Sequence, residues 1–139
     1  MTTLVDDRAL SEILRGERRI DGSVFTTGLW YLRLCQAVLT TNSPVQGSLW
    51  RPIAVLPPSV QQAAIAALMS LPEDIGLLSL RELGPTMAEL RSKYRLNLLS
   101  SEVLAAAKHL NASVLLTTRS PHLEDALAAE NLELIRTEG

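Results

Sequence analysis

The chain has 139 residues, a hydrophobic fraction of 47% and a net charge of −2, which predicts a single globular domain over residues 1–139 with a full hydrophobic core. The lack of any apolar run of roughly 18 to 20 residues argues against a membrane span, and the slightly negative charge carries no DNA-binding signature. The single cysteine, Cys35, excludes an intramolecular disulfide or a cysteine-based zinc cluster, and the lack of signal-peptide features predicts a cytoplasmic protein.

Five short apolar segments, bounded by polar or turn-forming residues, have the composition of β-strands. In chain order, the predicted strands are residues 3–5, 22–27, 74–80, 112–117 and 132–135. Helices are predicted at residues 7–15, 29–39, 57–70, from 84 onward, 103–110 and 121–129, with a loop at 41–47. We expect Ser100 or Ser101 to cap the alanine-rich helix that follows.

The alternation of strands and helices predicts the fold class. Strands separated by helical segments of ten or more residues need crossover connections, which make neighbouring strands parallel. A parallel sheet is covered by helices on both faces. The predicted fold is therefore a three-layer α/β/α domain with a central parallel sheet of four to five strands.

Two adjacent acids, Asp6 and Asp7, follow the first strand directly. The carboxyl ends of parallel strands are where α/β proteins gather ligands and catalytic groups, so either acid is a candidate metal ligand. Asp7 is also a good N-cap for the next helix, and we prefer that interpretation for Asp7. For Asp6, both interpretations stay open.

Three segments of the chain form a pattern with a fixed order. Residues 4–10 are an apolar strand that ends in an acid and leads into a helix. Residues 104–117 are an alanine-rich helix that leads to a strand ending in Leu115-Leu116-Thr117, and residues 132–135 form a closing strand. In this order the segments resemble the opening, the second signature and the closing strand of the PIN domains of VapC toxins. The resemblance covers nearly the whole chain and implies the α/β/α fold.

The resemblance also implies a site of three or four acids that holds Mg²⁺ or Mn²⁺ for RNA cleavage. Such hard cations need several oxygen ligands, and the bound metal activates water and neutralises charge on the phosphate. The first acid corresponds to Asp6. The second falls within residues 30–33, which contain no acid, the third at Ser100 or Ser101, and the fourth at Arg119.

These departures predict a degenerate metal site, of which Asp6 and Asp7 are the remnant. Asp7 is the best substitute ligand, whereas Glu102 is turned about 200° around its helix from the expected position. A partly buried carboxylate needs a partner, and arginine offers a charge-assisted one. We therefore hypothesise that Arg33 or Arg119 pairs with one of the two acids in place of a cation.

Three functions remain compatible with the sequence. The preferred one is a degenerate PIN-like domain that acts by binding, through homodimer formation, an antitoxin-like protein partner, or RNA held without cleavage. The second is an active Mg²⁺- or Mn²⁺-dependent ribonuclease, the toxin of a toxin–antitoxin pair, with a rearranged site at Asp6 and Asp7. The third is an unrelated α/β interaction domain. Apolar helices at 29–39 and 59–71 are candidates for a dimer interface or a peptide groove, and core burial explains them equally well.

Overall fold

A parallel sheet forms the centre of the domain. The structure, a computed structural model, describes residues 1–40 and 46–137. Within these residues the strands lie in the order β3–β2–β1–β4–β5, and every neighbouring pair is parallel. The strands are β1 Thr2–Val5, β2 Ser23–Thr26, β3 Ile75–Leu77, β4 Ser113–Leu116 and β5 Leu134–Arg136. The predicted parallel sheet is confirmed, with five strands.

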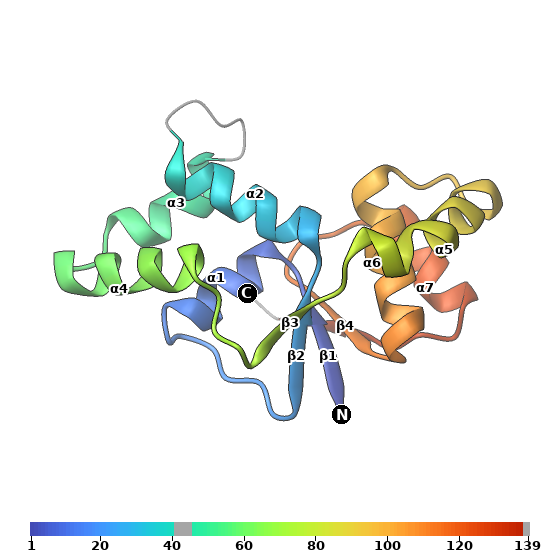
Figure 1. Cartoon of the computed structure of the whole chain (residues 1–139), viewed down its shortest axis with the longest axis horizontal. Helices are drawn as coiled ribbons and strands as arrows, with labels where there is room; N and C mark the ends of the chain where they lie inside the picture. The colour runs from blue at the N-terminus through green and yellow to red at the C-terminus, as the bar shows by residue number, and fades with distance from the viewer. Residues whose placement is uncertain (41–45, 138–139) are drawn as a thin grey trace.

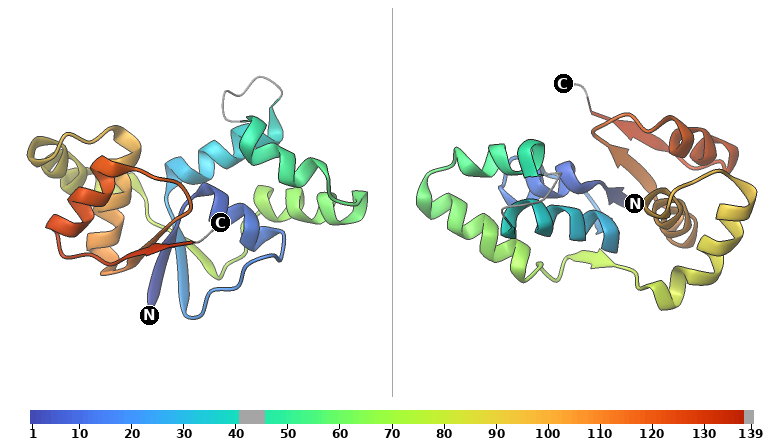
Figure 2. Two further views of the ribbon diagram at one scale, coloured as in Figure 1. Left: turned by 180° about the vertical axis from the view of Figure 1, so that it is seen from behind. Right: turned by 90° about the horizontal axis from the view of Figure 1, so that it is seen from above.

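Helices cover both faces of the sheet and form the predicted three layers (Figures 1 and 2). One layer contains α1 Asp7–Leu14, α2 Gly28–Leu39, α3 Gln46–Ala54 and α4 Pro58–Met69, and the other contains α5 Leu80–Lys93, α6 Leu98–Leu110 and α7 Pro121–Ala129. The view from above in Figure 2 separates the blue-to-green layer from the yellow-to-red layer. No helix in the described ranges combines the length and apolar character needed to cross a membrane.

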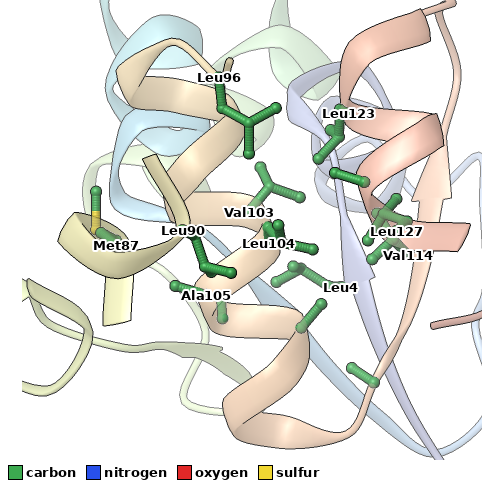
Figure 3. Close-up of a cluster of buried hydrophobic side chains, with 14 of the residues drawn as sticks. Leu4, Met87, Leu90, Leu96, Val103, Leu104, Ala105, Val114, Leu123 and Leu127 are labelled. Carbon is green, nitrogen blue, oxygen red and sulfur yellow. The ribbon is translucent and has the colours of Figure 1, made fainter. Parts of the chain in front are cut away.

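Alternate residues of β1 supply hydrophobic clusters on opposite faces of the sheet. Leu4 packs into the cluster beneath α5, α6 and α7, where it lies beside Leu104 (Figure 3). Val5, the next residue, packs into the cluster beneath α1 to α4 with Leu34. Both β1 residues are fully buried. Because successive side chains of a strand point to opposite faces, one short strand joins the two halves of the core.

Three helices depart from the sequence prediction, and one of them is α6, which begins at Leu98, five residues before the predicted start at residue 103. The other two, α3 and α5, contain proline. The helix α3 was not predicted, because Pro52 lies inside it; it forms with Leu49 and Ile53 buried on its inner side. The helix α5 begins at Leu80, four residues before the predicted start, and contains Pro85. Tertiary packing outweighs the poor intrinsic propensity of proline in both helices. Residues 41–45 of the predicted loop lie outside the described residues.

An acid at the end of α7 links this helix to α5 and α6. The carboxylate of Glu130 forms ion pairs with Lys93 at 2.9 Å and with Lys108 at 2.7 Å, and it accepts a hydrogen bond from the Tyr94 hydroxyl. The bond from Lys108, followed by those from Tyr94 and Lys93, lowers the pKa of Glu130 from 4.5 to about 2. The ionised form of Glu130 therefore adds polar contacts to the apolar packing between the three helices.

This cluster predicts a loss of stability in acid. Glu130 protonates near pH 4.5 in the unfolded chain but only near pH 2 in the fold, so its contribution to the free energy of unfolding is complete above pH 4.5 and falls away toward pH 2. Glu130→Gln should lower the urea midpoint at neutral pH and have a much smaller effect near the acid end of this window. The exposed Glu73, changed to Gln, is the matched control. An equal effect of Glu130→Gln at both pH values would contradict the prediction.

Candidate functional site

A cavity of about 230 Å³ lies at the carboxyl ends of β1 and β4. From β1 the chain builds outward to β2 and β3, and then returns to the other side of β1 to form β4 and β5. The junction of β1 and β4 is therefore the topological switch point, where α/β sheets bind their ligands. The cavity is lined by Asp6, Asp7, Trp30, Arg33, Asn97, Leu99, Ser100, Leu116, Thr118, Arg119, Ser120 and Leu123.

Asp6 joins the start of α1 to the end of β4. Its side chain is buried, with 2% of the residue surface exposed. The Oδ1 atom accepts a hydrogen bond from the Ala9 N–H at 2.9 Å, which makes Asp6 the N-cap of α1 and corrects the assignment of that role to Asp7. The Oδ2 atom accepts bonds from both the backbone N–H and the hydroxyl of Thr117, each at 2.7 Å. Both oxygens of Asp6 therefore already have protein donors.

Asp7 is paired with Arg33, as one form of the sequence hypothesis predicted. The Arg33 Nε atom, on α2, lies 3.1 Å from Asp7 Oδ2, in an ion pair whose N–H is not aligned for a hydrogen bond. Burial raises the pKa of Asp7, the neighbouring charge of Asp6 raises it further, and the charge of Arg33 lowers it. The pKa of Asp7 remains above its ordinary value of 3.8, so the arginine only partly offsets the cost of ionising this acid.

Removing Arg33 should raise the pKa of Asp7 further. A carboxyl pKa that is higher in the fold than in the unfolded chain makes the free energy of unfolding decline as the pH rises from about 4 through the folded-state pKa. Arg33→Gln removes the opposing charge, so it should destabilise the protein more at pH 7 than at pH 4. The Asp7 carboxyl titration, followed by carbon NMR, measures the shift directly. Arg119→Gln is the control, and an unchanged Asp7 titration in Arg33→Gln would refute the prediction.

Arg119 belongs to a separate group of charges. Its side chain is 74% exposed, and its Nε atom lies 3.4 Å from Glu124 Oε2 in the first turn of α7. The same carboxylate accepts a hydrogen bond from the Ser120 N–H at 2.7 Å and forms an ion pair with Arg136 of β5. The alternative in which Arg119 pairs with a strand-end acid is therefore wrong, because Glu124 is its partner.

Ser100 lines the cavity, whereas Ser101 does not. The helix α6 begins at Leu98, and its N-cap is Asn97, whose side chain accepts a hydrogen bond from the Ser100 N–H at 2.8 Å. The prediction that a serine caps this helix is therefore wrong. Ser101 is fully buried, and its hydroxyl donates to the Leu98 carbonyl at 2.7 Å. Of the two candidates for the third acid position, only Ser100 faces the other site residues.

The donor set of the cavity does not fit Mg²⁺ or Mn²⁺. The Asp6 oxygens accept three hydrogen bonds, Asp7 faces a guanidinium group, and the remaining candidate positions hold the neutral Ser100 and the cationic Arg119. Hard divalent cations need several oxygen ligands, mostly carboxylates. Across the described ranges, no three His, Cys, Asp or Glu side chains gather in a way that could hold a metal ion.

Several residues of the site were not predicted. Thr117 ends the Leu-Leu-Thr strand that the sequence singles out, yet only the fold shows that it binds Asp6, a residue 111 positions away. Asn97 also lines the cavity, and it could have been found as a helix-capping residue just before α6. Trp30 lines the cavity too, and it lies in the segment 30–33 that the sequence assigned to the second position. Glu102 lies off the site, as predicted; its carboxylate accepts a hydrogen bond from the Leu29 N–H at 2.9 Å.

Comparison with known proteins adds no assignment to this geometry. No profile of a known protein family matches the chain, and no curated protein matches it.

Proposed function

We propose that this chain is a PIN-like domain that acts by binding rather than by metal-dependent RNA cleavage. The observation that carries the proposal is the donor set at the switch point. Asp6 accepts hydrogen bonds that connect α1 to the end of β4, and Arg33 Nε lies 3.1 Å from Asp7 Oδ2, so a guanidinium group already neighbours the acid that would have to bind a metal ion. An acid remains at the first position of the VapC-like pattern, and Ser100 and Arg119 replace acids at later ones.

The surface next to the cavity supports a protein partner. An open groove of about 370 Å³ runs along α2 and the start of α6, and it shares Arg33, Asn97 and Leu99 with the cavity. On its rim, Leu32 and Leu98 are about half exposed, at 48% and 52%. An apolar groove that leads into a polar cavity fits a peptide segment that places apolar side chains along α2 and a polar group at the strand ends.

A homodimer is part of the same proposal. The α1–α4 layer carries exposed apolar side chains at Leu39 on α2 and at Val60 and Met69 on α4. Exposed apolar side chains are common at the interfaces of small domains. We place this dimer in the cytoplasm, with an antitoxin-like protein segment as the partner of the groove. RNA held without cleavage is the alternative that the binding assays below separate from it.

The decisive test measures metal binding and cleavage together. Calorimetric titration with millimolar Mn²⁺ or Mg²⁺ should give no saturable heat, and single-stranded RNA should remain intact both with added metal and with EDTA. Saturable binding that is lost in Asp7→Asn, together with EDTA-sensitive cleavage, would instead establish the active ribonuclease with a rearranged site. A gel-shift assay on the same RNA in EDTA reports binding without cleavage.

Restoring the acids provides the matched positive experiment. A triple variant with Arg33→Glu, Ser100→Asp and Arg119→Asp places carboxylates at the three positions that depart from the VapC-like pattern. We expect this variant to acquire Mn²⁺ binding. The control variant carries Leu98→Asp in place of Ser100→Asp. Leu98→Asp adds the same charge to the first turn of α6, but residue 98 does not line the cavity. Failure of the triple variant, if folded, to bind Mn²⁺ any better than this control would count against the PIN-like assignment.

A further inference from the structure

Glu102, on α6, is a buried acid outside the strand-end site. Only 2% of its surface is exposed, and its Oε1 atom accepts a hydrogen bond from the Leu29 N–H at the start of α2. Its Oε2 atom lies 3.3 Å from the point that a Cβ on residue 28 would occupy, so Gly28 allows the carboxylate to approach α2 closely. Among the described residues, no Lys, Arg or His forms an ion pair with Glu102.

This carboxylate lines a cavity of about 230 Å³ between the start of α2, the β3–α5 connection and α6. The rest of the lining is almost entirely hydrocarbon, and the side chains that form it are Leu29, Leu78, Leu80, Met87 and Leu98, with Ser79 as a further polar group. Leu80 and Leu98 are 61% and 52% exposed, so the cavity opens to solvent beside these two leucine side chains. The structure therefore places one acid at an apolar cavity that a solute can enter.

The chemistry of the lining selects the ligand. A carboxylate removed from water is favoured by a cation beside it, and here the α2 N-terminus supplies only a partial positive charge. One carboxylate is too few oxygen ligands for Mg²⁺ or Ca²⁺, and an anion such as phosphate is repelled. The leucine and methionine walls suit a hydrocarbon stem. The volume lies below the roughly 300 to 1,000 Å³ of pockets for drug-sized ligands, so the ligand is small.

We propose that the Glu102 cavity binds an organic monocation: an ammonium or guanidinium group on a short apolar stem. The cation is held by Oε2 while Oε1 keeps its bond to α2, and the stem lies against Leu80, Met87 and Leu98. A free amine and the side chain of a lysine or arginine from another protein share this chemistry. The site is separate from the strand-end cavity, so its test does not depend on the function proposed above.

The test is an NMR titration of the full chain with n-butylammonium, n-butylguanidinium and, as the neutral match, n-butanol. The cations should shift the amide signals of Gly28 and Leu29 and the methyl signals of Leu80, and should bind at least about tenfold more tightly than the alcohol. Glu102→Gln keeps an acceptor for the Leu29 N–H but loses the charge. It should weaken binding of the cations by about ten- to hundredfold and leave the alcohol unchanged.

A second variant covers the case in which Glu102→Gln fails to fold. Leu98→Lys places an internal ammonium group at the exposed rim and should abolish binding of the added cations by competing for Glu102. Leu32→Lys adds the same charge to a similarly exposed position of α2 outside the cavity and should bind normally. Cations that bind no better than n-butanol, or an unchanged affinity in Leu98→Lys, would mean that Glu102 is only a structural cap for α2.

A parallel titration distinguishes the two sources of the cation. A short capped peptide with one arginine between leucines is compared with the same peptide carrying citrulline, which is neutral. Preference for the arginine peptide over n-butylguanidinium assigns the site to a side chain of a partner protein, and the reverse order assigns it to a free amine or guanidine. If neither cation shows a preference over its neutral match, the proposal is wrong.

Discussion

Asp6→Ala is expected to lower the melting temperature by about 10 °C in buffer that contains no divalent metal. The substitution leaves the Ala9 N–H, the Thr117 N–H and the Thr117 hydroxyl without their acceptor at a buried position. Loss of an N-cap costs about 1 kcal/mol, and loss of a bond to a charged group costs about 1.5–3 kcal/mol. The expected total is about 3 kcal/mol. Each kcal/mol lowers the melting temperature of a domain of this size by roughly 3–4 °C, which gives about 10 °C.

Two further variants separate the contacts of Asp6. Thr117→Val keeps the shape of the side chain and removes only the hydroxyl donor, so it should cost about 1 kcal/mol. The double variant should lose less than the sum of the single losses, because both changes break the same bond. A melting temperature for Asp6→Ala within about 2 °C of the parent, or a loss seen only when Mn²⁺ is present in the parent sample, would contradict a structural role.

This role bears directly on the proposed function. In an active metal site the strand-end acid is needed for the ion, and its removal matters most to activity. In this chain Asp6 has a structural role of its own, because its hydrogen bonds connect the start of α1 to the end of β4. A domain that binds without cleaving still uses the acceptors that Asp6 supplies at this position. The presence of Asp6 in the sequence is therefore poor support for catalysis.

Much of the fold could be predicted because each strand is short, apolar and separated from the next by a helical segment. That spacing alone requires crossovers and a parallel sheet. The order of the strands could not be predicted, since it depends on which apolar faces pack together. The helix α3 was missed because Pro52 breaks the helical pattern, and burial of Leu49 and Ile53 outweighs that signal.

The residue types of the site and the pairing of Arg33 with Asp7 were predicted, but the partners of Asp6 and of Arg119 were not. Asp6 and Asp7 are adjacent and equally suited to capping, and only Thr117, brought in by β4, shows which one is held. Asn97, Ser100 and Ser101 can all begin a helix, and an error of one residue turns a side chain by about 100°. The Glu102 cavity was invisible in the sequence, because it depends on the approach of Gly28 to a helix distant in the chain.

The second large loss of stability is expected when a buried leucine is shortened to alanine in the core on either face of the sheet. Leu104 on α6 and Leu34 on α2 are almost completely buried, at 0% and 1% exposure, in separate clusters. Leu104→Ala and Leu34→Ala should each cost about 2–5 kcal/mol in urea unfolding. The sheet separates them, so the double variant should lose the sum within about 0.5 kcal/mol. Exposed Leu98→Ala and Leu32→Ala are the matched controls and should change the free energy of unfolding by less than about 0.5 kcal/mol.

Both single variants should still unfold in one transition, with far-UV circular dichroism and tryptophan fluorescence coinciding. The reason is the alternation in β1: Leu4 is buried against the α5–α7 layer and Val5 against the α1–α4 layer, so neither layer can separate without exposing a residue of the shared strand. Two transitions in Leu104→Ala would mean that the α5–α7 layer unfolds alone. Because the cavity at the switch point is formed by residues of both layers, such a division would also uncouple Arg33 on α2 from Ser100 on α6 and leave neither half able to form the site.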